Sequence, residues 1–233
     1  MKIKALAAAL ASLVVLATPA SSPAQRHRAP VAQRDWSLIA ARTPDGGVRI
    51  GNPAAPVKLV EYGSISCPHC AAFSAESAAA LRARYVRSGR VSYEYRPYLI
   101  FPTDPGIFML LNCLGPARFF SAAEQLYATQ DEWFGRVRAL PAAELQRIQG
   151  LSTIEQSAAL VHAAGLDPFF RARGLTAAQI NACLADRAGI ARLAAISRRG
   201  NALGVQGTPT FFLNGRSIGT VSWARLEPML AAR

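Results

Sequence analysis

The sequence predicts an α/β fold in which a β-α-β half and a β-β-α half are separated by an inserted all-helical segment. β-prone runs at 57–64 and 90–99 flank a helical pattern, which indicates the first half. The pattern between 103 and 203 is helical. Two short β-prone runs around Asn214-Gly215 precede a last helical pattern, which indicates the second half.

The strands of the first half are expected as follows. GVRIG is a candidate short edge strand. VKLVEYGS, at 57–64, is rich in Val, Leu and Tyr and follows a proline-containing loop, so it is expected to be a central strand. RVSYEYRPYL, at 90–99, alternates tyrosine with polar residues and should end as a strand near Pro97.

A helix is expected between these strands, from Pro68 to Ser88. Proline is tolerated at its start because the first N–H groups of a helix have no intrahelical partner, and Gly89 supplies a stop. A strand, a helix and a second strand in this order predict a parallel pair of strands.

The helical stretch from about 103 to 203 is expected to hold four or five helices. Asp104 before Pro105 is a candidate N-cap. STIE at 152–155 and TAAQ at 176–179 match the capping box, in which the first and fourth residues satisfy each other's backbone donors.

The chain should end in an antiparallel hairpin and a helix. The expected elements are a strand at 210–213, a turn at Asn214-Gly215, a strand at 216–220 and a helix from about residue 222. The predicted organisation is a signal peptide at 1–24, a flexible leader with one short helical turn at 25–46, a first α/β half at 47–102, a helical insertion at 103–186 and a second half at 187–233.

The first residues have the layout of a secretory signal peptide. Two lysines precede the apolar run Ala5 to Ala17, and small residues follow, so that cleavage after Ala20 or Ala24 is expected. The run is short for a membrane-spanning helix, and an uncleaved anchor is the alternative. The protein is therefore expected to be exported.

The net charge of +12 comes from arginines scattered along the chain. Arg198-Arg199 is the only adjacent arginine pair, so the sequence shows no basic stripe for a phosphate backbone and nucleic-acid binding is not expected. Dispersed positive charge favours solubility, or encounters with acidic polypeptides and anionic membrane surfaces.

Cys67 and Cys70 form a C-x-x-C pair for which three roles are open: a metal site, a structural disulfide or a reacting pair. A zinc site needs four ligands, and a c-type haem needs histidine directly after the second cysteine, where Ala71 stands. The other candidate ligands stand alone in the sequence, at Cys113, Cys183, His27 and His162. Neither metal nor cofactor is expected.

Chain entropy separates the two possible disulfides. Closing the short Cys67–Cys70 loop stabilises the fold by only about 2 kcal/mol, whereas joining Cys113 to Cys183 stabilises it by about 4 kcal/mol. The first pair is therefore expected to react and the second to staple the helical segment. Separate buried thiols remain the alternative for the second pair.

The position of Cys67 predicts a reactive thiolate. Because it lies where a strand gives way to a helix, unpaired helical N–H groups and the helix dipole should lower its pKa. His69 can add a donor or a positive charge. A stabilised thiolate favours the reduced pair, which makes the disulfide a strong oxidant. Cys70, one turn inside the helix, should be buried and should resolve mixed disulfides formed at Cys67.

These residues resemble the thioredoxin superfamily and, within it, the DsbA family of periplasmic thiol oxidases. The resemblance covers 48–233 and rests on CPHC, with Pro68 and His69 between the cysteines, on Glu61, on GTPTFF at 207–212 and on the inserted helices. It implies a thioredoxin fold with an inserted all-helical subdomain.

The resemblance also implies roles for individual residues. A cis Thr208–Pro209 bond would bind extended substrate beside the sulfurs, and Glu61 would exchange a proton with Cys70. Alternatively, Glu61 is a carboxylate satisfied by Tyr or Arg neighbours. A second disulfide resembles the alpha-proteobacterial type. The best-known DsbA oxidases have valine where Thr208 stands, so this residue predicts a weaker oxidant and Thr208→Val a stronger one.

The expected function is oxidation of reduced or unfolded exported polypeptides through a mixed disulfide at Cys67. The family implies a periplasmic location and reoxidation by a DsbB-like, quinone-linked membrane partner, and the protein is expected to be a monomer. A disulfide isomerase or reductase of the same fold is one alternative. A non-catalytic peptide-binding chaperone is the other, and the intact CPHC argues against it.

Overall fold

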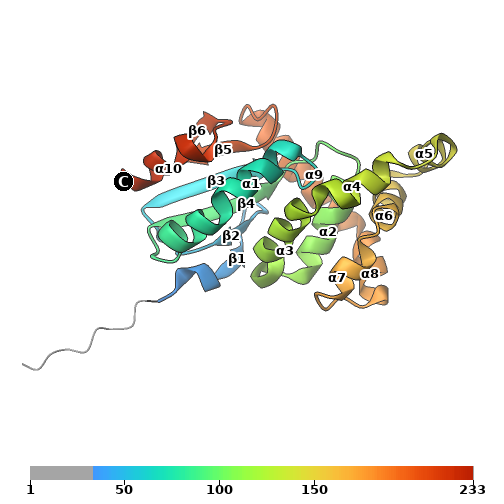
Figure 1. Ribbon diagram of the computed structural model, residues 1–233, viewed down its shortest axis with the longest axis horizontal. Helices are drawn as coiled ribbons and strands as arrows, with labels where there is room; N and C mark the ends of the chain where they lie inside the picture. Colours follow the sequence, from blue (N-terminus) through green and yellow to red (C-terminus); the bar gives the residue numbers. More distant parts are fainter. Residues whose placement is uncertain (1–33, 233) are drawn as a thin grey trace, which may run out of the picture. The chain divides into compact units, whose positions relative to one another are not determined.

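The structure is a computed structural model that describes residues 34–232 (Figure 1). The expected signal peptide and residues 25–33 of the expected leader lie outside the described residues. The described elements, in order, are η1 (Trp36–Leu38), β1 (Ala40–Arg42), β2 (Val48–Ile50), β3 (Val57–Gly63), α1 (Pro68–Ala80), η2 (Leu81–Val86), β4 (Val91–Pro97), α2 (Asp104–Leu114), α3 (Pro116–Ala128), α4 (Gln130–Arg138), α5 (Ala142–Gln149), α6 (Thr153–Ala163), α7 (Asp167–Arg171), α8 (Ala177–Leu184), α9 (Arg187–Ala202), β5 (Thr210–Leu213), β6 (Arg216–Gly219) and α10 (Trp223–Ala231).

The six strands among residues 34–232 form one mixed sheet in the order β1-β2-β4-β3-β5-β6. β3 pairs in parallel with β4 and antiparallel with β5, so it is the central strand that its composition predicts. Val57 and Leu59 on β3 are completely buried, which places the core directly beneath the element that leads to the cysteine pair.

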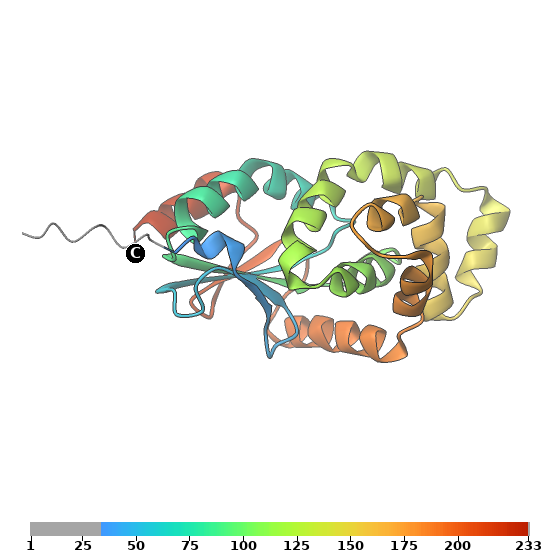
Figure 2. The same cartoon turned by 90° about the horizontal axis from the view of Figure 1, so that it is seen from below.

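Helices cover both faces of the sheet. Figure 2 shows α9 on the opposite side of the sheet from α1 and α10. The helices α2–α8 gather at one end of the sheet, where α3 packs against α1. The predicted order of a β-α-β half, a helical insertion and a β-β-α half is confirmed.

Several local predictions are confirmed. The Gln179 backbone N–H donates to the Thr176 hydroxyl, and the Thr176 backbone N–H donates to the side-chain Oε1 of Gln179, which completes that capping box. The capping box at 152–155 is present as well. Asn214 and Gly215 both have positive φ, 49° and 81°, as a tight hairpin turn requires.

Two predictions about the start of the fold are wrong. Residues 40–42 of the expected flexible leader form β1, and GVRIG is not an edge strand because β2 pairs with β1 on one side and β4 on the other. The leader's short helical turn is present as η1. The stretch before β2 has little apolar alternation of its own, and its pairing depends on a partner strand presented by the folded chain.

Two predictions about the helical insertion are also wrong. Among the described residues, 103–203 hold eight helices rather than four or five, because short helices such as α7 escape periodicity analysis. Asp104 does not cap α2 but is its first residue. Its carboxylate is completely buried and accepts from the N–H groups of Ile100 and Phe101, each at 2.9 Å.

A disulfide joins Cys113 of α2 to Cys183 of α8, across 70 residues of sequence. The alternative of separate buried thiols is therefore wrong. Cys113 is exposed and Cys183 is half-buried, so the bridge lies at the surface of the helical block. None of the helices among residues 34–232 combines the length and apolar character that crossing a membrane requires.

Candidate active site

The cysteine pair lies where the central strand gives way to a helix. β3 ends at Gly63, a four-residue active-site loop (64–67) follows, and α1 begins at Pro68. Cys67 is the N-cap of α1, in extended conformation with φ −82° and ψ 123°. Proline fits the next position because its missing N–H would have no helical partner there.

Cys67 is held as a stabilised thiolate. The residue is 5% exposed, and hydrogen-bond donors lower the pKa of its thiol to about 5. The largest cause is a hydrogen bond from the Cys70 thiol, and the Thr208 side chain and the N–H groups of Cys70 and His69 add to it against the cost of burial. When protonated, Cys67 donates to the Thr208 carbonyl oxygen at 3.3 Å.

Cys70 has the opposite character. It is completely buried, and desolvation raises the pKa of its thiol well above the usual value, with the hydrogen bond to Cys67 and the charges of Glu61 and Cys67 acting in the same direction. Both cysteines are free thiols in the structure. The pair therefore holds one proton, on Cys70, in the neutral pH range.

Pro68 and His69 are both exposed on the first turn of α1. The contribution of His69 to the Cys67 thiolate comes from its backbone N–H. Its imidazole has no hydrogen bond or ion pair in the structure, so the expected side-chain donor is not seen among the described residues. The ring instead stands at the rim of the site, where it faces solvent.

Thr208 and Pro209 lie beside Cys67, joined by a cis peptide bond. The Thr208 hydroxyl is buried and finds no hydrogen-bond partner among the described residues. It is therefore available as a donor when Cys67 ionises, which agrees with its lowering of the pKa of Cys67. This sign is opposite to the expectation that Thr208 weakens the oxidant.

Thr208→Val is expected to raise the pKa of Cys67 by about one unit, because a hydrogen bond to a charged group contributes about 1.5–3 kcal/mol. The ultraviolet absorbance of the thiolate, titrated against pH, measures this shift. Thr210→Val is the matched control, since the Thr210 hydroxyl donates to the Gly207 carbonyl instead. A lower pKa of Cys67 in Thr208→Val would instead agree with the family resemblance, which implies that valine at this position makes the disulfide a stronger oxidant.

Glu61 lies on β3, buried beneath the pair. The Tyr93 hydroxyl donates to its carboxylate at 2.5 Å, so the tyrosine partner foreseen in the alternative reading is present. Burial raises the pKa of Glu61 to about 7, with the charge of Cys67 adding to the shift and the Tyr93 bond opposing it. A carboxyl with this pKa takes up and releases protons at neutral pH.

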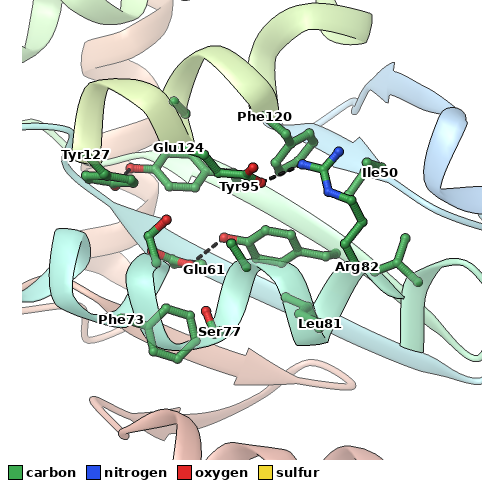
Figure 3. Close-up of a pocket in the computed structure, with 15 residues that line it drawn as sticks. Ile50, Glu61, Phe73, Ser77, Leu81, Arg82, Tyr95, Phe120, Glu124 and Tyr127 are labelled. Carbon is green, nitrogen blue, oxygen red and sulfur yellow. Dashed lines mark hydrogen bonds and ion pairs between the residues drawn. The ribbon is translucent and has the colours of Figure 1, made fainter. Parts of the chain in front are cut away.

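Glu61 also lines a small cavity between the sheet, α1 and α3 (Figure 3). The cavity has a volume of about 40 Å³, which is large enough to hold water. Arg82 and Glu124, paired at 2.5 Å and each about one-third exposed, line it as well. The Glu61 carboxyl therefore faces a cavity that can admit water.

Sequence reasoning missed the residues that hold the active-site loop. Gln130 and Tyr127 donate to its carbonyl oxygens, and Asp104, expected to be an N-cap, accepts from its N–H and hydroxyl groups. Only Asp104 had a sequence signal, as a carboxylate at the start of an apolar helix. Across residues 34–232, no three His, Cys, Asp or Glu side chains gather in a way that could hold a metal ion.

Comparisons with known proteins agree with this geometry. A family model described as thioredoxin matches residues 43–232. The crystal structure of a protein-disulfide isomerase from Novosphingobium aromaticivorans is 33% identical, covers 79% of this chain and 95% of its own, and superposes with a TM-score of 0.75. Wolbachia pipientis alpha-DsbA1 is 20% identical over 79% of this chain and 88% of its own, with a TM-score of 0.59, and shows similarity of fold.

A curated relative in Rickettsia conorii, named "Putative protein-disulfide oxidoreductase", is 26% identical over 119 residues. The match covers 51% of this chain and 41% of the Rickettsia protein, so the aligned region spans less than half of that relative. The thioredoxin model, in contrast, spans most of the chain. The chain therefore belongs to the thioredoxin family.

Proposed function

We propose that this protein is a thiol:disulfide oxidase that donates the Cys67–Cys70 disulfide to reduced exported polypeptides. The observation that carries the proposal is the opposite shift of the two thiols: the pKa of Cys67 falls to about 5, and that of Cys70 rises well above its usual value. A pair whose reduced form is stabilised in this way gives up its disulfide readily.

The reaction begins when a substrate thiolate attacks the sulfur of Cys67 in the disulfide. A substrate–Cys67 disulfide forms, the Cys67–Cys70 bond breaks, and Cys70 leaves with the electron pair and takes a proton, which the buried Glu61 carboxyl, whose charge acts on Cys70, can supply. A second substrate thiolate then attacks the substrate sulfur, and Cys67 leaves as its stable thiolate. The substrate is oxidised by two electrons, and the pair is reduced by two.

The setting of this reaction is also part of the proposal. The predicted signal peptide would take the chain to the periplasm, where thiols can stay oxidised. Reoxidation would come from a DsbB-like, quinone-linked membrane partner, and the protein would act as a monomer.

Disulfide isomerisation is the second candidate. The Novosphingobium structure, 33% identical, is of a protein-disulfide isomerase. An isomerase works in its reduced form and attacks substrate disulfides with the Cys67 thiolate, so a low pKa of Cys67 serves it as well, and the two functions differ in the redox state in which the pair is kept.

A trapping experiment tests the proposal. Oxidised wild type, mixed with a reduced and unfolded polypeptide, should form one substrate disulfide for each Cys67–Cys70 consumed. Cys70→Ser, loaded at Cys67 with a small-molecule disulfide, should accumulate mixed disulfides with a polypeptide that carries a single thiol, because neither Cys70 nor a second substrate thiolate is then present to break them. Non-reducing electrophoresis and mass spectrometry measure both products.

Cys67→Ser is the matched control and should form few adducts, because Cys70 is completely buried. Traps at Cys70 in Cys67→Ser would reverse the assigned roles. Rearrangement of mispaired disulfides by the reduced protein, without net oxidation by the oxidised form, would favour the isomerase. Binding of unfolded polypeptide without thiol exchange would favour the chaperone.

A further inference from the structure

Side chains of the helical insertion (103–186) form hydrogen bonds with the backbone of the active-site loop. The Gln130 amide, at the start of α4, donates from Nε2 to the carbonyl oxygens of Ile65 and Cys67 at 2.7 and 3.1 Å. Gln130 is 6% exposed, so both bonds are shielded from water. One uncharged side chain thus binds the residue that caps the helix and the residue two positions before it.

Two further side chains of the helical insertion form hydrogen bonds with the same loop. The Tyr127 hydroxyl donates to the Ser64 carbonyl oxygen at 3.1 Å. The buried Asp104 carboxylate accepts from Ser66 N–H at 3.2 Å and from the Ser64 hydroxyl at 2.9 Å. Every residue of the active-site loop therefore has a hydrogen bond to a side chain that comes from the helical insertion.

These hydrogen bonds affect the Cys67 sulfur because they fix the backbone conformation of Cys67. The N–H groups of His69 and Cys70, in the first turn of α1, lower the pKa of the Cys67 thiol, and Cys67 has the extended N-cap conformation. The Cys67 carbonyl also accepts from Ala71 N–H at 3.1 Å, the first hydrogen bond of α1. Gln130 binds that same carbonyl from outside the helix, and so fixes the peptide plane on which the N-cap geometry depends.

We infer that Gln130 is a positioning residue for the reaction of Cys67. Its amide holds the Ile65 and Cys67 carbonyls so that the sulfur stays in line with the N–H groups at the start of α1. Gln130 does not touch the sulfur and carries no charge, so it acts through geometry alone. The inference rests on the proposed function in one respect, that Cys67 is the reacting sulfur.

Gln130→Met tests this role, because methionine matches the length of glutamine and lacks the two donors. We expect the pKa of Cys67 to rise by about one unit, so that at pH 5 the ionised fraction falls from about a half to about a tenth. Thiolate absorbance against pH measures the shift, and the alkylation rate of Cys67 at pH 5 should fall about fivefold. Gln149→Met, at the exposed end of α5, is the matched control and should leave both readouts unchanged.

Gln130→Glu provides a second variant of the same length. Its carboxylate would face two carbonyl oxygens and add negative charge near the thiolate, so the pKa of Cys67 should rise further than in Gln130→Met. Melting of each reduced variant shows whether the fold is kept. A purely structural role for Gln130 would lower the melting temperature and leave the pKa of Cys67 in the folded protein unchanged.

The inference is overturned if folded Gln130→Met and Gln130→Glu both titrate at Cys67 within about 0.3 units of wild type. The proposed oxidase function has a separate outcome. It fails if the wild-type disulfide does not oxidise reduced polypeptides, whatever the difference in pKa between wild type and the Gln130 variants. The two failures are therefore read from different measurements.

Discussion

The reduced protein is expected to melt about 2–4 °C above the oxidised protein at pH 7, although a disulfide normally stabilises a fold. The Cys67 thiolate, with its pKa lowered to about 5 from the usual 8.5 or so, stabilises the reduced form by about 3 kcal/mol at pH 7. The Cys67–Cys70 disulfide, which closes a very short loop, stabilises the oxidised form by only about 2 kcal/mol. The stabilisation of the reduced form by the thiolate therefore exceeds the stabilisation of the oxidised form by the disulfide.

The order of melting should reverse on acidification. The folded pKa of Cys67 is depressed, so its contribution is complete above the unfolded value of about 8.5 and is lost as the pH falls towards about 5. The loop contribution does not depend on pH, and the two become equal near pH 6.5. The raised pKa of Glu61 makes the fold less stable as the pH rises, which is the opposite pH dependence. Its main cause is burial, which is present in both redox forms, so it does not change their order of melting.

Paired calorimetric melts of the two forms between pH 5 and pH 8 measure this order, with Cys113–Cys183 kept oxidised in both samples. The double variant Cys67→Ser/Cys70→Ser is the control, and its melting should not respond to redox treatment. An oxidised form that melts higher at pH 7, with a Cys67 pKa near 8, would contradict the proposal that the disulfide is a strong oxidant. It would favour a reductase function instead.

Removing the second disulfide should produce the larger loss of stability. Cys113→Ala/Cys183→Ala is expected to lower the free energy of unfolding by up to about 4 kcal/mol, because the bridge closes a loop across 70 residues. This corresponds to a fall of about 8–16 °C in melting temperature. The bridge ties α2 to α8 and lies apart from the active-site loop, so thiol exchange at Cys67 should remain.

Denaturant unfolding of wild type and the double variant measures the loss, and replacing both cysteines avoids an unpaired thiol. Thiol blocking followed by mass spectrometry should show the bridge intact in untreated protein. Mild reductant should open Cys67–Cys70 first even though Cys113 is exposed, because the low pKa of the Cys67 thiolate stabilises the reduced form of that pair. Two alkylated thiols at 113 and 183 in untreated protein, or a loss below about 1 kcal/mol, would contradict the staple.

Local signals in the sequence determined most of the architecture. The β-prone run at 57–63, the proline at the start of α1 and the Asn214-Gly215 turn each act within a few residues, so the strand, the helix and the hairpin could be predicted where they occur. The placement of Cys67 at a helix start likewise predicted its acidic thiol, because the donors come from the next turn of the same helix.

The tertiary structure alone decided the contacts between distant segments. Cys67 and Thr208 lie 141 positions apart, and Gln130 lies 63 positions from Cys67, so no local pattern shows that these residues meet. The sign of the Thr208 effect depends on where a buried hydroxyl points, and Asp104 became a buried acceptor rather than a helix cap because folding brought 64–66 against it. Burial, which sets the pKa of Glu61 and Cys70, is a property of the packed molecule and not of the neighbouring residues in the chain.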